Sequence, residues 1–197
     1  MLIKTLPVTK PIVLRQIQTS DASEIFQTID RQRQYLGKWL PFVAFTKQEA
    51  DTFRFIQTIV EENAAKREYV FVILHEGCFA GVIGFKDTDR LNQRTEIGYW
   101  LAEEMQGKGI VTQSVKKMCH FAFEELGINR IQIKCAVGNF PSKKVPRRLN
   151  FHLEGIERDG ELLAGGQFTN LEVYSLLKSE FKSAETSRNQ YDEKIKL

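Results

Sequence analysis

The sequence lacks the long apolar segments by which membrane and secreted proteins are recognised. It has no run of about 18 apolar residues that could span a bilayer. Its first ten residues, MLIKTLPVTK, do not contain the long apolar core of a signal peptide. We therefore expect a cytoplasmic protein with no membrane partner.

Cysteine and histidine are also scarce, which argues against disulfides and metal sites. The three cysteines, Cys78, Cys119 and Cys135, are widely separated, and each lies in an apolar segment. The three histidines share no ligand spacing. We expect the cysteines to pack in the core and no metal to be bound.

The charge balance is nearly even. The chain has 28 Lys and Arg against 25 Asp and Glu, and the basic residues are spread out except at Lys143-Lys144 and Arg147-Arg148. A nucleic-acid partner is therefore not expected.

At 197 residues and 42% hydrophobic content the chain can bury a real core. We predict one domain over residues 1–181 and, because no apolar stripe continues beyond it, a polar tail over residues 182–197.

Apolar periodicity predicts alternating strands and helices. Strands are expected at residues 12–18, 69–74, 79–85, 96–101 and 130–137. Helices are expected after Ser20 or Asp21, after Thr46, after Gly109 and over residues 142–149. The run at 69–74 is continuously apolar, which is typical of a strand covered on both faces.

Two of these helices carry predicted buried stripes. The stripe of the first helix is Ala22, Ile25, Phe26 and Ile29, and that of the second is Ala50, Phe53, Ile56, Val60 and Ala64. Between them lies an aromatic turn with Trp39 and Phe42. It either faces a substrate or staples the two helices together, and we favour the staple.

A glycine-containing loop joins the strand at 96–101 to the helix that follows. Its residues are Gln106, Gly107, Lys108 and Gly109. The first turn of a helix has unpaired N–H groups, and glycine lets backbone approach an anion without a Cβ in the way. A pyrophosphate would fit here. The spacing matches neither G-x-x-x-x-G-K-[ST] nor G-x-G-x-x-G.

The remaining pattern, Q-x-x-G-x-V at Gln106, Gly109 and Val111, resembles the acetyl-CoA loop of the Gcn5-related N-acetyltransferases, R/Q-x-x-G-x-G/A. Val111 stands where that family has a small residue. Asn139 and Ser142, followed by the stretch Asn150 to Gly155, resemble the N-x-x-S and G-F-x-x-E-G of the RimJ/RimL branch, the ribosomal-protein N-terminal acetyltransferases. The likeness runs from about residue 12 to residue 178.

The resemblance implies an α+β (mixed α/β) fold. We expect a single GNAT-like domain with a central, mostly antiparallel sheet of about seven strands flanked by helices. Two splayed parallel strands would hold the pantetheine arm of acetyl-CoA, and the loop amides would take the pyrophosphate. The implied cofactor-binding residues are Trp100, Leu101, Ala102, Gln106, Gly107, Lys108, Gly109, Ile110, Val111, Thr112, Asn139, Ser142 and Lys143.

The resemblance also implies catalytic roles. Ser142 would protonate the leaving thiolate, and Glu161, expected in a late loop after the flexible Gly160, would act as the base. Glu96 is the rival base, and a strand amide near Leu101 would meet the oxyanion. The alternatives are solvated surface carboxylates at Glu161 and Glu96, and helix capping by Ser142 or Asn139.

Three functions remain open at this point. The first is acetyl transfer from acetyl-CoA to the N-terminal α-amino group of a protein, possibly ribosomal. The second keeps the donor but takes a small amine, such as a polyamine, an amino acid or an antibiotic. The third is an acyl-CoA-binding module without turnover. The protein is expected to be a monomer or a homodimer.

Overall fold

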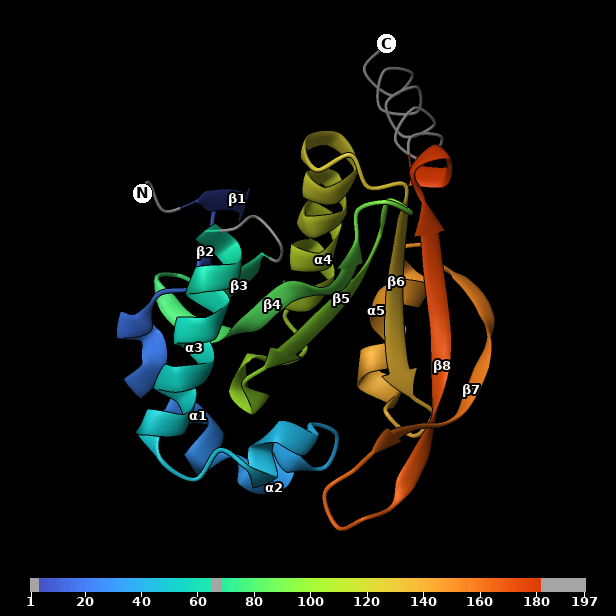
Figure 1. Cartoon of the computed structure of the whole chain (residues 1–197). Coiled ribbons are helices and arrows are strands. Elements are labelled where there is room, and N and C mark those ends of the chain that lie inside the picture. The colour runs from blue at the N-terminus through green and yellow to red at the C-terminus, as the bar shows by residue number, and fades with distance from the viewer. Residues whose placement is uncertain (1–3, 65–68, 182–197) are drawn as a thin grey trace.

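The computed structural model describes residues 4–64 and 69–181 of the chain (Figure 1). Within these residues eight strands form one sheet in the order β1-β2-β3-β4-β5-β6-β8-β7. Neighbouring strands are antiparallel except for the parallel pair β5 and β6. The strands are β1 (Thr5–Thr9), β2 (Ile12–Gln16), β3 (Val70–His75), β4 (Cys78–Asp89), β5 (Arg94–Leu101), β6 (Arg130–Ala136), β7 (His152–Leu162) and β8 (Phe168–Leu177). The mixed, mostly antiparallel sheet is confirmed, with one strand more than the seven expected.

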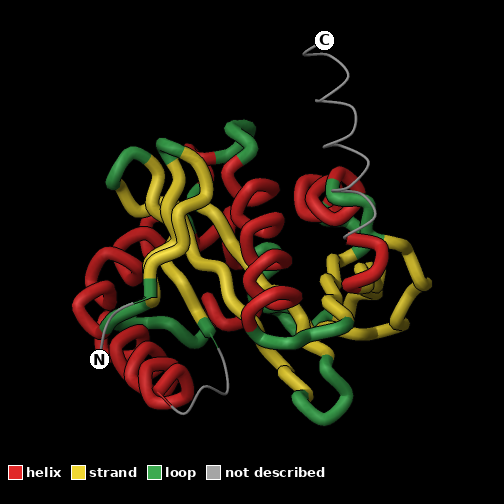
Figure 2. The backbone as a smooth tube through the Cα atoms, turned by 90° about the horizontal axis from the view of Figure 1, so that it is seen from above, coloured by secondary structure: helices red, strands yellow, loops and turns green. Residues whose placement is uncertain are grey.

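Helices cover both faces of the sheet (Figures 1 and 2). They are α1 (Ala22–Arg31), α2 (Arg33–Gly37), α3 (Glu49–Ala64), α4 (Ile110–His120) and α5 (Phe140–Arg148). A π-helical turn over Phe121–Glu125 follows α4, and Gly127, with φ of 69°, ends this helical segment. None of the helices in the described part of the chain is long and apolar enough to cross a membrane.

The core has two parts, one on each side of the sheet. β3 shows how the sequence builds both, because its residues Val70 to Ile73 are all buried. Val70 and Val72 pack with α1 and α3, whereas Phe71 and Ile73 pack on the side of α4. The continuous apolar run is thus confirmed as a strand covered on both faces.

The predicted stripe of α3 is confirmed at Ile56 and wrong at Ala50, Phe53 and Val60. The buried side chains are Thr52, Ile56 and Ile59, whereas Phe53 and Val60 are 45% and 36% exposed. The buried face therefore keeps Ile56 but has Thr52 and Ile59, at helical spacing i−4 and i+3 from it, in place of Phe53 and Val60. The side chain of Ala64 lies outside the described residues. Cys78 is also exposed rather than in the core, while Cys119 and Cys135 are buried as expected.

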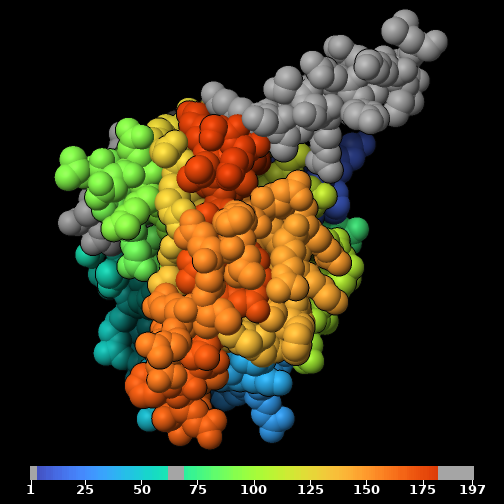
Figure 3. Space-filling model, turned by 90° about the vertical axis from the view of Figure 1, so that its right-hand side faces the viewer, coloured from blue at the N-terminus to red at the C-terminus, as the bar shows by residue number. Residues whose placement is uncertain are grey.

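β7 is the edge strand of the sheet, next to β8 (Figure 3, orange). β7 pairs with β8 alone, and its residues His152 to Asp159 are exposed. The polar tail predicted for residues 182–197 lies outside the described residues.

Candidate active site

The site is built where the parallel strands β5 and β6 part. They pair only between Arg94–Glu96 and Arg130–Gln132, and beyond that point they diverge (Figure 1). The amide of Ala102 donates to the Ala80 carbonyl of β4 at 2.8 Å. Since successive residues of a strand direct their amides to opposite edges, the N–H groups of Tyr99 and Leu101 face the gap toward β6. The gap therefore has hydrogen-bonding backbone along one wall.

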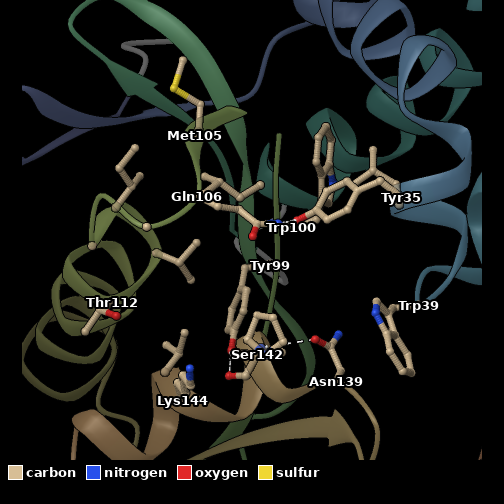
Figure 4. Close-up of a pocket in the computed structure, with 18 of the residues that line it drawn as sticks. Tyr35, Trp39, Tyr99, Trp100, Met105, Gln106, Thr112, Asn139, Ser142 and Lys144 are labelled. Atoms are coloured by element: carbon tan, nitrogen blue, oxygen red, sulfur yellow. Dashed lines mark hydrogen bonds between the residues drawn. The ribbon is translucent and has the colours of Figure 1, made fainter. Parts of the chain in front are cut away.

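A cavity of about 400 Å³ occupies this gap (Figure 4). Tyr99, Trp100 and Leu101 of β5 line it. The glycine loop and the first turn of α4 form a second wall, α5 a third, and the region of α2 closes the remaining side. Of the predicted cofactor-binding residues, the cavity brings together Trp100, Leu101, Gln106, Gly107, Gly109, Ile110, Val111, Thr112, Asn139 and Ser142.

The glycine loop has the geometry of an anion cradle. Gly107 and Gly109 have φ of 75° and 73°, a left-handed conformation that favours glycine. A Cβ at either position would have no neighbour within 4 Å, so the space in front of the loop is open. Gly109 is the N-cap of α4, and the amides of Ile110, Val111 and Thr112 therefore have no intrahelical partner. These residues fit the pyrophosphate of a CoA-type ligand.

Ser142 lies in the first turn of α5 and points into the cavity (Figure 4). The cap of this helix is Asn139, whose Oδ1 accepts a hydrogen bond from the Ser142 amide at 3.2 Å. Asn139 therefore caps the helix, and the Ser142 hydroxyl does not have the capping role that was the alternative to catalysis. Its Oγ lies 3.2 Å from the Tyr99 hydroxyl and 3.3 Å from Cys135 Sγ.

Tyr99 is a site residue that the sequence did not single out. Its hydroxyl is also 3.1 Å from the Ser142 carbonyl oxygen, to which it donates. Burial, together with the neighbouring Cys135, raises the pKa of Tyr99 well above its ordinary value. The phenol therefore keeps its proton and acts as a donor that orients Ser142. The sequence signal that could have identified Tyr99 was its position in the alternating strand 96–101.

Comparison with known proteins agrees with this geometry. Residues 12–152 match the family model described as an acetyltransferase (GNAT) domain. The chain belongs to the GNAT acetyltransferase family. It is 40% identical over 184 residues to the putative ribosomal N-acetyltransferase YdaF of Bacillus subtilis (strain 168), covering 90% of this chain and 97% of that protein. Identity to the ribosomal-protein-serine acetyltransferase of Escherichia coli (strain K12) is 31% over 160 residues, covering 81% and 89%.

Solved structures of acetyltransferases are also similar to the chain. RimL, the ribosomal L7/L12 α-N-protein acetyltransferase in complex with coenzyme A, has a TM-score of 0.84 at 28% identity, covering 88% of this chain and 98% of that one. The microcin C7 self-immunity acetyltransferase MccE, in complex with acetyl-CoA and AMP, has a TM-score of 0.81 at 30% identity, covering 86% and 94%. These likenesses confirm the expected fold, the acetyltransferase activity and acetyl-CoA as the donor.

Three of the residues predicted to bind acetyl-CoA do not line the cavity of this GNAT domain. Ala102 is buried, and its amide is used by Ala80. Lys108 lies on the loop but turns its Nζ toward Met105 Sδ, at 3.7 Å. Lys143 is buried against Glu172, with 2.8 Å between Nζ and Oε1. Its neighbour Lys144 faces the cavity instead, as does Arg148.

Glu96, one candidate base, sits at the paired end of β5. Its side chain is 7% exposed, lies 2.8 Å from Lys86 Nζ and accepts a hydrogen bond from Gln132 Nε2 at 3.0 Å. Burial alone would lower the pKa of Lys86, but the ion pair with Glu96 outweighs it and raises that pKa. The structure does not bring Glu96 to the cavity wall.

Glu161, the other candidate, lies in β7 opposite Thr169. The prediction of a flexible loop here is wrong: Gly160 packs on Leu171, whose Cδ1 would be 3.0 Å from a Cβ at that glycine. Glu161 does not line the cavity, but its charge contributes to raising the pKa of Lys86. Both candidate carboxylates therefore lie near enough to Lys86 to raise its pKa.

The aromatic turn after α2 reaches the site. Trp39 lines the cavity and covers Gly138, where an added Cβ would lie 2.9 Å from the ring. Tyr35, which the sequence analysis missed, accepts a hydrogen bond from Gln106 of the glycine loop (Figure 4). The favoured staple is therefore wrong for Trp39, which faces the cavity. Phe42 is 40% exposed.

Proposed function

We propose that the chain transfers the acetyl group of acetyl-CoA to the N-terminal α-amino group of a protein, with a ribosomal protein as the acceptor. The observation that carries this proposal is the 31% identity, over 81% of the chain, to a ribosomal-protein-serine acetyltransferase. The RimL likeness at 28% identity and a TM-score of 0.84 supports it. A ribosomal acceptor also agrees with the cytoplasmic location expected from the sequence.

The geometry supports separate roles for the groups that line the gap. When bound, acetyl-CoA supplies an acetyl group activated as a thioester. The amides of Ile110 to Thr112 would hold its pyrophosphate, and the Leu101 amide, which faces the gap, would donate to the carbonyl oxygen as negative charge develops there. The gap and the glycine cradle thus account for both ends of the donor.

Ser142 is suited to protonate the leaving sulfur. Its hydroxyl borders the cavity at the end of β6, and the Tyr99 phenol lies within hydrogen-bonding distance of it. A donor that acts on charge developing in the transition state contributes to turnover more than to binding. Tyr99 is the residue that positions this donor.

The acceptor amine must lose a proton. An α-amino group has a pKa near 8, against about 10.4 for lysine, so a weak base or water suffices for an N-terminus. Glu161 is our proposed base, acting through water because it does not line the cavity, since its side chain is only partly buried and no ion pair within the described residues engages it. Glu96 is the second choice, since Lys86 and Gln132 already engage its carboxylate.

A small acceptor is the second candidate, favoured by the likeness to MccE, whose structure holds acetyl-CoA together with AMP. Trp39 and Tyr35 would offer such a ligand aromatic surface. Incubation of the protein with labelled acetyl-CoA and purified ribosomal proteins, N-terminal peptides or a panel of small amines separates the two. Label on peptide α-amines supports the proposal, and label confined to small amines overturns it. Donor binding without transfer to any amine would indicate a binding module.

A further inference from the structure

Helix α5 carries two basic doublets, Lys143-Lys144 and Arg147-Arg148. Successive residues of a helix are about 100° apart, and residues four apart lie on the same side. The doublets therefore divide into two rows, one with Lys143 and Arg147 and one with Lys144 and Arg148. The two rows meet different surroundings.

The first row is neutralised by Glu172 of β8. The Glu172 carboxylate lies 2.8 Å from Lys143 Nζ and 3.2 Å from Arg147 Nη2. Arg147 Nε also donates to the Tyr174 hydroxyl at 2.9 Å. This row anchors α5 to the sheet and has a structural role.

The second row has no such partner. Lys144 and Arg148 are exposed, both line the cavity, and neither forms an ion pair with any carboxylate in residues 4–64 or 69–181. Like charges four residues apart disfavour a helix modestly. The helix dipole favours Arg148 in the last turn, but it gives no reason for Lys144 in the middle. An anion in the cavity would relieve the repulsion of both.

The position of this row identifies the anion. Lys144 and the first turn of α4, with Thr112, lie on adjoining walls of the same cavity (Figure 4). The amides of α4 suit the pyrophosphate of CoA, but CoA has a further phosphate, the 3′-monoester on its ribose. Such a monoester carries nearly two negative charges at neutral pH and is well matched by two cationic side chains.

We propose that Lys144 and Arg148 form a subsite for the 3′-phosphate of acetyl-CoA. This inference rests on acetyl-CoA being the donor and does not depend on which amine is the acceptor. It replaces Lys143, the residue that the sequence suggested for the cofactor's phosphates, with the next residue of the same doublet. Lys143 itself is committed to Glu172.

The test is binding of CoA and of dephospho-CoA, which lacks only the 3′-phosphate, measured by calorimetry without an acceptor. Wild type should bind CoA about tenfold more tightly, the gain expected from charge-assisted contacts at an exposed site. Lys144→Gln/Arg148→Gln should bind both ligands with the wild-type affinity for dephospho-CoA. The preference of wild type should also shrink as salt is raised.

The matched control is Lys10→Gln/Arg158→Gln, which removes the same two charge types from exposed positions outside the cavity. It should keep the tenfold preference. An unchanged preference in Lys144→Gln/Arg148→Gln overturns the subsite. So does an equal loss for both ligands, which would place these cations at the pyrophosphate. Failure of the acceptor assignment would leave all these affinities unaffected, and thermal unfolding of each variant verifies that it is folded.

Discussion

The two ends of the β5–β6 pair contrast sharply. At the paired end, between Arg94–Glu96 and Arg130–Gln132, polar side chains satisfy one another: Glu96 binds Lys86 and Gln132. At the open end the strands have separated, backbone amides face a cavity, and Ser142 and Tyr99 border it. One strand thus serves stability at its start and chemistry at its end.

The difference teaches that pairing decides which polar groups are available to a ligand. A carboxylate in a satisfied pair has its lone pairs used and is costly to disturb. A hydroxyl or amide at the open end has unused hydrogen-bonding capacity. Substitutions at the two ends should therefore differ in what they change, ligand binding and turnover at the open end and stability at the paired end.

Gly109→Glu should abolish binding of CoA at the open end, with a loss of at least about 100-fold in affinity. The new carboxylate would occupy the place of the pyrophosphate and repel it. The measurement is the thermal shift that acetyl-CoA produces, since a ligand of the folded state raises stability. Gly77→Glu, at a hairpin glycine with φ of 82°, introduces the same strain away from the cavity and should keep the shift. Normal affinity in folded Gly109→Glu would refute the cradle.

Ser142→Ala should lower kcat about 10- to 100-fold and leave CoA binding close to wild type. The lost donor acts on the leaving sulfur, so its absence is felt in the transition state. Tyr99→Phe should give a smaller loss of the same kind, because Ser142 keeps its hydroxyl but loses a partner. Steady-state kinetics with calorimetry measures both. Wild-type turnover in Ser142→Ala would leave this serine without a catalytic role.

Glu96→Gln should destabilise the paired end by about 1–2 kcal/mol, because Lys86 loses its partner while 52% of its side chain remains solvated. The kcat of the folded protein should follow the wild-type pH profile. Chemical denaturation and a pH–rate profile measure the two quantities. A profile that loses its acidic limb would instead make Glu96 the base.

Glu161→Gln should keep CoA binding and lower activity several-fold near neutral pH. The loss should shrink as pH rises toward the pKa of the α-amino group, near 8, because more of the amine is then already neutral. The comparison is one of pH–rate profiles for wild type and variant on a single accepted peptide. Parallel profiles would eliminate Glu161 as the base.

The smallest effect is expected at Glu154, which ties the start of β6 to β7 and β8. Arg130 donates to both of its carboxylate oxygens, Ser175 donates to one, and these bonds lower the pKa of Glu154 to about 2. The depressed pKa stabilises the fold above the ordinary pKa near 4.5, and this stabilisation is lost as pH falls toward 2. Because the side chain is 38% exposed, solvent screening limits the effect to about 1 kcal/mol or less. Glu154→Gln should show a flatter decline of unfolding free energy over that range, and an identical decline would refute the coupling.

Local patterns determined much of this protein. The alternation of β5 and the glycines before α4 are properties of short segments, and the structure has the strand, the left-handed glycines and the helix start where those residues require them. The continuous burial of β3 followed from its apolar run. Such features depend on backbone geometry and on neighbours within one turn or strand, so they can be predicted without the fold.

Only the tertiary structure decided which member of each polar group reaches the cavity. Lys143 and Lys144 are adjacent in sequence, yet only Lys143 forms a hydrogen-bonded ion pair with Glu172, 29 residues later in the chain. Lys144 lines the cavity instead. The Glu96 carboxylate is engaged in an ion pair with Lys86. The Tyr99 hydroxyl is placed within hydrogen-bonding distance of Ser142, 43 residues away in the chain. These outcomes depend on packing between distant segments, because an ion pair or hydrogen bond forms only where folding brings both partners within a few ångströms.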